Sequence, residues 1–151
     1  MSRWIIAALI AAGLSRAAGA QASPPPSGAT RVDVPAIVTR GLEAYRTGGI
    51  GAAADVWLVG SPISSDAARA QLIGALAQLD AAYGHMVGAD VVDVLPLGPH
   101  VRRVYVVVRM ERGPLYGFLE CYQTVGGDWI IPSFLFNAKA SEILPSRLLG
   151  G

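Results

Sequence analysis

Two kinds of hydrophobic periodicity divide the chain near Gly84. Before this glycine, apolar residues recur at spacings of three and four, which is typical of helices that bury one face. After it, apolar and polar residues alternate as far as Asn137, which is typical of strands with one buried face. This order predicts an α+β fold in which helices cover one face of a curved antiparallel sheet.

Three N-terminal helices are predicted. The first begins at an N-cap aspartate and ends at a glycine pair, the second is short, and the third begins at a serine cap and ends at a glycine. The expected bounds are Asp33 to Gly49, residues 50–59, and Ser64 or Ser65 to Gly84.

Four strands are predicted between Gly84 and Asn137, with turn signals at "LGPH", "ERGP" and "VGGD". In the second strand Val104, Val106 and Val108 form an apolar side that must meet the helices, called here the inner face. Tight turns place Val104 opposite Cys121 and Leu119 opposite Phe134.

The only cysteine of the chain, Cys121, is expected on the inner face, where a small thiol packs as an apolar group. The alternative is a reactive thiol, which would need an electropositive and partly exposed setting. A pocket between sheet and helices would be lined by Tyr83, Asp93, Cys121 and Phe134, unless side chains such as Trp57 fill it.

The opposite side of the sheet, called here the outer face, is unusually aromatic. An exposed apolar patch of this kind usually marks an interface, so a homodimer through the sheet is expected. The alternative is that the C-terminal residues "AKASEILPSRLL" fold back over it. The predicted dimer face comprises Arg103, Tyr105, Arg109, Tyr116, Phe118, Glu120, Tyr122, Trp129, Ile131 and Leu135.

The N-terminal residues have the features of a secretory signal. Arg3 precedes an apolar run that starts at Trp4, and the small-residue tract "AGAQA" offers cleavage sites after Ala20 or Ala22. We therefore expect a signal peptide at 1–22, a flexible proline-rich leader at 23–32 and a single domain at 33–147. The mature protein is expected to be periplasmic or secreted, with no membrane attachment after cleavage.

Composition narrows the range of partners. The chain has 12 basic and 11 acidic residues, and cleavage removes two of the basic ones, Arg3 and Arg16. The mature protein is thus near neutral, and nucleic-acid binding is not expected. Neither His85 nor His100 has a histidine or cysteine partner at metal-ligand spacing, so no metal or cofactor is expected.

Several stretches together resemble a known superfamily. They are "YG" at Tyr83, "RRVYVVVRMERGPLYGFLECY", "GGDWIIPSFLFN" and the closing "ILP". These stretches look like small exported bacterial proteins of unknown function that are similar to the nuclear transport factor 2 superfamily, also called cystatin-like. The resemblance implies a cone of helices on a curved sheet, frequent dimerisation through the sheet, and a pocket used for binding or catalysis.

Two functions are therefore expected. The first is a non-catalytic binding or assembly module, with a small apolar ligand as a further candidate partner. The second is a lyase, isomerase or hydrolase with a pocket aspartate, because burial raises a carboxyl pKa toward a useful range. With a two- or four-residue turn around His100 and an unbulged strand, Asp93 would face inward beside Val106 and Asp90 outward beside Arg109. A three-residue turn or a bulge would reverse this assignment.

Overall fold

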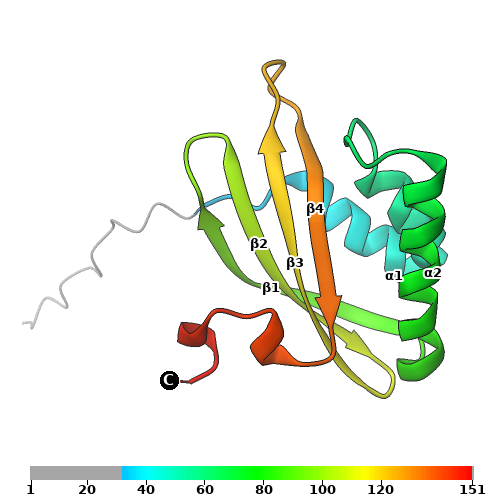
Figure 1. The fold of residues 1–151 in the computed structure, drawn as a ribbon. Coiled ribbons are helices and arrows are strands. Elements are labelled where there is room, and N and C mark those ends of the chain that lie inside the picture. Colours follow the sequence, from blue (N-terminus) through cyan, green and yellow to red (C-terminus); the bar gives the residue numbers. More distant parts are fainter. Residues whose placement is uncertain (1–31, 151) are drawn as a thin grey trace, which may run out of the picture. The chain divides into compact units, whose positions relative to one another are not determined.

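The computed structural model describes residues 32–150, which form two helices and a four-strand sheet (Figure 1). The strands pair antiparallel in the order β1-β2-β3-β4, so the sheet is open. The predicted α+β class and four strands are confirmed. The elements are α1 (Ala36–Trp57), α2 (Asp66–Tyr83), β1 (Met86–Pro96), β2 (Val101–Met110), β3 (Gly113–Gln123) and β4 (Trp129–Asn137).

The predicted signal peptide at 1–22 lies outside the described residues, as does the predicted leader at 23–32 apart from its last residue. Neither helix of residues 32–150 has the length and apolar character needed to cross a bilayer.

Helix α1 combines the first two predicted helices, so the prediction of three helices is wrong. The expected break is a kink within α1, where Gly49 has φ 76° and ψ −174°. A straight helix would place Gly41 and Trp57 about 24 Å apart. Instead the indole of Trp57 lies directly against Gly41, so the kink folds the second half of α1 back on the first.

The start of α1 also differs from the prediction. Pro35 is the N-cap residue, and no side chain caps the helix. Asp33 was expected in this role, but its backbone carbonyl instead accepts a hydrogen bond from Nη1 of Arg102 (2.6 Å). A proline next to the first helical residue has a φ that suits a helix start and no N–H to satisfy, which explains the shift.

Both ends of α2 are as predicted. Oγ of Ser65 accepts a hydrogen bond from the backbone N–H of Ala68 (3.2 Å). Gly84 ends the helix with φ 82°, a conformation that favours glycine.

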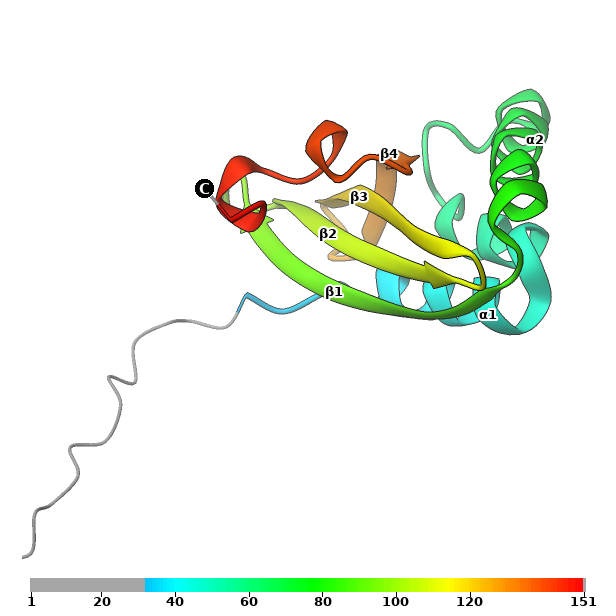
Figure 2. The same cartoon turned by 90° about the horizontal axis from the view of Figure 1, so that it is seen from below.

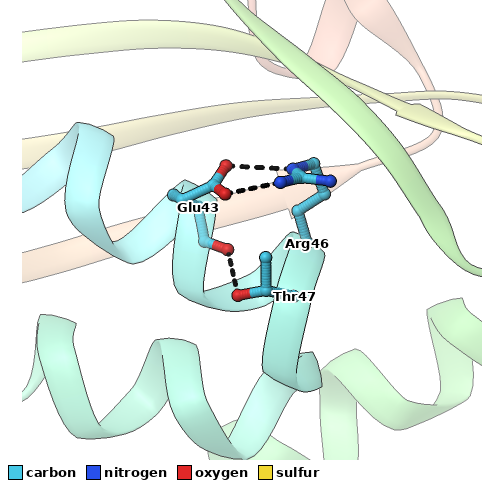
Figure 3. Close-up of polar contacts among 3 residues, drawn as sticks. All are labelled: Glu43, Arg46 and Thr47. Atoms are coloured by element: carbon cyan, nitrogen blue, oxygen red, sulfur yellow. Dashed lines mark hydrogen bonds and ion pairs between the residues drawn. The ribbon is translucent and has the colours of Figure 1, made fainter.

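The solvent side of α1 carries a local polar cluster (Figure 3). Arg46 donates from Nε and Nη2 to the two carboxylate oxygens of Glu43 (2.9 and 2.5 Å), and Oγ1 of Thr47 donates to the Glu43 carbonyl (2.8 Å). The hydrogen bond from Arg46 lowers the pKa of Glu43. Glu43 and Arg46 thus form an exposed ion pair within one turn of α1.

The hydrophobic core lies between α1 and the inner face of the sheet. The inner-facing valines of β2 are fully buried, as the alternation predicted. The core residues are Ile37, Val38, Leu42, Tyr45, Ala53 and Trp57 of α1, with Met86, Val104, Val106, Val108, Met110, Leu115, Leu119, Cys121 and Ile131 of the sheet.

The register between β2 and β3 differs from the prediction by two residues. Met110 pairs with Gly113, so the turn consists of Glu111 and Arg112 alone. As a result Val104 lies opposite Leu119 rather than Cys121. Because the shift is an even number, every side chain keeps its predicted face.

Pairing between β3 and β4 follows the prediction from Gly117 to Glu120, including Leu119 opposite Phe134. A β-bulge follows, since Glu120 pairs with Ser133 but Tyr122 pairs with Ile130. The extra residue is on β4 beside Pro132, and proline is tolerated at bulges because it has no N–H for the ladder. The bulge reverses the faces of all residues of β4 before it.

The residues after β4, 138–150, are called here the C-terminal segment. It contains two single-turn 3₁₀ helices, η1 (Ala140–Glu142) and η2 (Ser146–Leu148). Arg147 forms an ion pair with Asp93 of β1, so the segment runs from one edge of the sheet to the other. Figures 1 and 2 show it on the face of the sheet away from α1.

Candidate functional site

The space between α1 and the sheet, where a pocket was expected, is filled by aromatic side chains. The ring centroids of Trp57 lie 5.8 Å from Phe134 and 5.9 Å from Phe136. Trp57 is fully buried. Phe134 does border a hollow of about 280 Å³ between α2 and β4, lined by Leu72, Ala75, Leu76, Leu79, Leu135 and Phe136. The predicted pocket residues Tyr83, Asp93 and Cys121 do not line this hollow.

Cys121 is buried in the core, as predicted. Its Sγ lies 4.0 Å from the carbonyl oxygen of Leu119. Burial raises the pKa of the Cys121 thiol to about 12, although the nearby Arg102 lowers it in part. A nucleophilic thiol needs the opposite shift, so the arrangement favours an unreactive side chain.

Thiol labelling of the native protein is therefore expected to be slow and to follow global unfolding. At pH 8 the labelling rate should rise steeply with denaturant, because the reagent reaches Cys121 only in the open chain. The measurement is the rate of reaction with an aromatic disulfide reagent, read by absorbance. Labelling of the folded protein as fast as that of a small free thiol would contradict the burial of Cys121.

The raised pKa of Cys121 also predicts a loss of stability at alkaline pH. The folded pKa is above the unfolded value of about 8.5, so the contribution is complete below pH 8.5 and is lost as pH rises toward 12. Between pH 9 and 10 the free energy of unfolding should fall by up to about 1.4 kcal/mol per pH unit. Cys121→Ala should reduce this slope in urea titrations.

The candidate catalytic residue Asp93 lies on the outer face, which corrects the inward orientation predicted for an unbulged strand. A bulge between Val91 and Asp93 places Asp93 opposite Tyr105 rather than Val106. Its Oδ1 accepts from the backbone N–H of Val94 (2.9 Å), and its Oδ2 pairs with Arg147. Its carboxylate therefore serves the C-terminal segment and does not face the helices.

Asp90 also lies on the outer face. It pairs in the ladder with Val107, two positions from the predicted partner Arg109. Its carboxylate still reaches Nε of Arg109 (3.1 Å) in an exposed ion pair. Neither aspartate of β1 can then act in a pocket on the inner side.

A buried tyrosine and an aspartate meet between the two helices. Oη of Tyr45 donates to Oδ1 of Asp80 at 2.5 Å, and burial together with this bond raises the pKa of Tyr45. Tyr83, predicted as a pocket residue, packs against the core, with its ring near Gly113. The hydrogen bond between Tyr45 and Asp80 joins α1 to α2. Neither residue lines any of the cavities described here.

A second cavity is a groove between the two halves of α1 and the β3–β4 turn, called here the α1–hairpin groove. Its volume is about 580 Å³, which is within the range of small-molecule sites. Its apolar lining includes Ile37, Val56 and Trp129. The remaining lining residues are Ala36, Arg40, Asp55, Val59, Gly60, Thr124, Gly127, Asp128 and Ile130.

Charged side chains surround the α1–hairpin groove. Asp55 pairs with Arg69 (2.6 Å), whereas Arg40 has no ion-pair partner within residues 32–150. The guanidinium of Arg102 lies 4.7 Å from the ring centroid of Trp129. No pattern in the sequence indicates this groove, because only the kink in α1 and the β4 bulge bring its residues together.

The outer face keeps most of the predicted dimer residues but loses two. The β4 bulge turns Trp129 and Ile131 inward, where Ile131 is fully buried in the core and Trp129 packs against it. The strand registers place the other predicted members on the outer face: Arg103, Tyr105, Arg109, Tyr116, Phe118, Glu120, Tyr122 and Leu135.

Polar pairs separate the apolar groups of the outer face. Nη2 of Arg103 donates to Oε2 of Glu120 (2.7 Å), a bond that raises the pKa of Arg103. The same guanidinium lies 4.9 Å from the ring centroid of Phe118. Tyr122 and Leu135 remain 41% and 49% exposed, whereas Tyr105 is only 5% exposed.

Across residues 32–150, no three His, Cys, Asp or Glu side chains come close enough together to hold a metal ion. The fold defines the class of protein: two helices packed on one face of an open four-strand antiparallel sheet. No family model, curated protein or solved structure gives a match to this chain.

Proposed function

We propose that this protein is an exported, non-catalytic binding or assembly module that forms a homodimer through the outer face of its sheet. The observation that carries the proposal is the exposure of Tyr122 and Leu135 on a face that also bears Phe118 and two ion pairs. Aromatic side chains interleaved with arginine are typical of protein interfaces.

The sequence resemblance to the nuclear transport factor 2 superfamily supports the same proposal. Members of that superfamily often dimerise through the sheet, and in this chain no α-helix covers the corresponding face, on which the C-terminal segment with η1 and η2 lies (Figure 1). The N-terminal signal pattern in the sequence supports export to the periplasm or the cell exterior.

The alternative function is a lyase, isomerase or hydrolase with a pocket aspartate, and it requires an aspartate of β1 that faces the helices. Asp93 pairs with Arg147 on the outer face, and Cys121 is buried with a raised pKa. A small ligand is better accommodated by the α1–hairpin groove, where Arg40 has no ion-pair partner within residues 32–150 and Trp129 supplies an apolar surface.

Leu135→Glu is expected to weaken the dimer, because a two-fold interface would bury the new carboxylate twice, once from each copy, against apolar side chains. Native mass spectrometry of the mature protein, purified from its own host, reports the oligomeric mass and any retained ligand together. The dimer should weaken by at least about tenfold.

The matched control is Leu97→Glu, which places the same charge on another exposed leucine, in the turn between β1 and β2. This variant should keep the mass of the unmodified protein. A monomeric unmodified protein, or a Leu135→Glu variant that remains dimeric, would reject association through the outer face. A retained small molecule would direct attention to the α1–hairpin groove.

A further inference from the structure

The lining of the α1–hairpin groove includes two side chains of opposite charge. Arg40 lies on the same face of α1 as Ala36 and Ile37, which also line the groove. Asp128 lines it from the turn between β3 and β4. Within residues 32–150 neither Arg40 nor Asp128 forms an ion pair, with each other or with any other residue. A ligand that pairs with both must carry an anionic and a cationic group.

The other charges at the groove already have partners. Asp55, the third charged lining residue, accepts hydrogen bonds from Nε (3.1 Å) and Nη2 (2.6 Å) of Arg69. Arg102 is not a lining residue, and its guanidinium lies 4.7 Å from the ring centroid of Trp129 while Nη1 donates to the Asp33 carbonyl (2.6 Å). The charges that the lining offers to a ligand are therefore one guanidinium and one carboxylate.

Apolar side chains form much of the rest of the groove. Ile37 belongs to the core cluster and is buried, and Val56 and Trp129 pack against that cluster. This part of the lining is therefore the rim of the hydrophobic core. A volume of about 580 Å³ is sufficient for a ligand that has an apolar side chain as well as charged groups. The groove thus suits an organic molecule better than a simple ion.

Local contacts fix the walls of the groove in place. In the β3–β4 turn the backbone N–H of Thr124 donates to the Asp128 carbonyl (2.8 Å), and that of Gly127 donates to the Thr124 carbonyl (2.9 Å). Past the end of α1, a Cβ on Gly60 would lie 3.2 Å from Cγ2 of Ile130, so the chain there lies directly against β4. A site with fixed walls binds its ligand with little loss of conformational entropy.

We infer that the α1–hairpin groove binds a small zwitterion with an apolar body, namely an amino acid or a short peptide with apolar side chains. Arg40 pairs with the carboxylate of the ligand, for which a guanidinium has matching geometry. Asp128 accepts hydrogen bonds from its ammonium group, and Trp129 contacts its apolar side chain. The inference rests on the proposed role as a binding module and does not depend on the dimer.

Isothermal titration calorimetry of the mature protein tests the inference with L-leucine, L-phenylalanine and the dipeptide leucyl-phenylalanine. The tightest of these probes is then compared with two derivatives. N-acetylation removes its ammonium charge, and amidation removes its carboxylate charge. Each derivative should bind about tenfold more weakly, because each loses one charge-assisted contact. Tighter binding of the dipeptide would identify short peptides as the ligand class, and tighter binding of either amino acid would identify free amino acids.

Two variants assign the two charges to their residues. Arg40→Gln should weaken binding about tenfold and abolish the difference between the probe and its amide. Asp128→Asn should weaken binding to a similar extent and abolish the difference between the probe and its acetylated form. Arg46→Gln and Asp66→Asn are the matched controls, since neither residue lines the groove, and both should keep the unmodified dissociation constant. Circular dichroism checks that each variant is folded.

The outcomes separate the groove from the dimer. Binding that loses each discrimination in the matching variant supports the inference. Absence of binding by all three probes would overturn it, and so would discrimination that both variants retain, because the ligand would then bind elsewhere. Native mass spectrometry of the same samples reports the dimer independently. A dimer that binds none of the probes would overturn the groove inference alone, and a monomer that binds none would overturn both the groove inference and the proposed function.

Discussion

Gly41→Ala is expected to destabilise the protein by about 3 kcal/mol, although alanine is the better helix former. A Cβ on Gly41 would lie 1.9 Å from Nε1 and 2.3 Å from Cδ1 of Trp57. The indole is fully buried and packs on Phe134 and Phe136, so it has no free space to enter. The clash must therefore separate the two halves of α1 or displace the ring from the core.

Urea unfolding followed by tryptophan fluorescence and circular dichroism measures this effect. The matched control is Gly74→Ala in α2, where an added Cβ meets nothing within 4 Å. That variant should be more stable than the unmodified protein by about 0.5 to 1 kcal/mol. Equal effects of the two substitutions would show that Gly41 does not lie under the indole.

Gly117→Ala is the second substitution with a large expected effect, at about 1 to 3 kcal/mol of destabilisation. Gly117 is on the inner face of β3, opposite Phe136, and an added Cβ would lie 2.4 Å from two carbons of that ring. Trp57, on which the ring is stacked at 5.9 Å, blocks its movement toward α1. The extra methyl group would push on the same aromatic cluster from the sheet side.

Gly88→Ala in β1 is the matched control for Gly117→Ala. Its added Cβ would also be 2.4 Å from a neighbouring atom, but that atom is Nη2 of Arg109, the end of a flexible side chain that is 58% exposed. The guanidinium can move into solvent, so stability should change by no more than about 0.5 kcal/mol. Thermal and urea unfolding of both variants provide the comparison. Equal losses of stability would argue against the ring position of Phe136.

Local patterns in the sequence were sufficient to predict most of the strands, turns and helix ends. The purely apolar side formed by Val104, Val106 and Val108 placed β2 and its buried face correctly. Turn residues located the hairpins, and Ser65 and Gly84 marked both ends of α2. The glycine pair at 48–49 indicated the break in α1, but not that its two halves would fold together around Gly41.

The errors in the candidate site come from two β-bulges. One in β1 turned Asp93 from the inner to the outer face, and one in β4 turned Trp129 and Ile131 from the outer to the inner face. A single inserted residue reverses every side chain beyond it, because the strand period is two. Pro132 was a signal for the second bulge, since proline within a sheet is largely confined to edges and bulges.

The sequence by itself determined the class of fold, the order of its strands and the burial of Cys121. These properties depend on periodicity, turn residues and polarity, which are local to each segment. Only the tertiary structure decided that Trp57, Phe134 and Phe136 fill the interior, that the α1–hairpin groove is open instead, and that the C-terminal segment crosses the outer face. These features depend on how side chains from distant parts of the chain pack against one another, and no local pattern in the sequence specifies that packing.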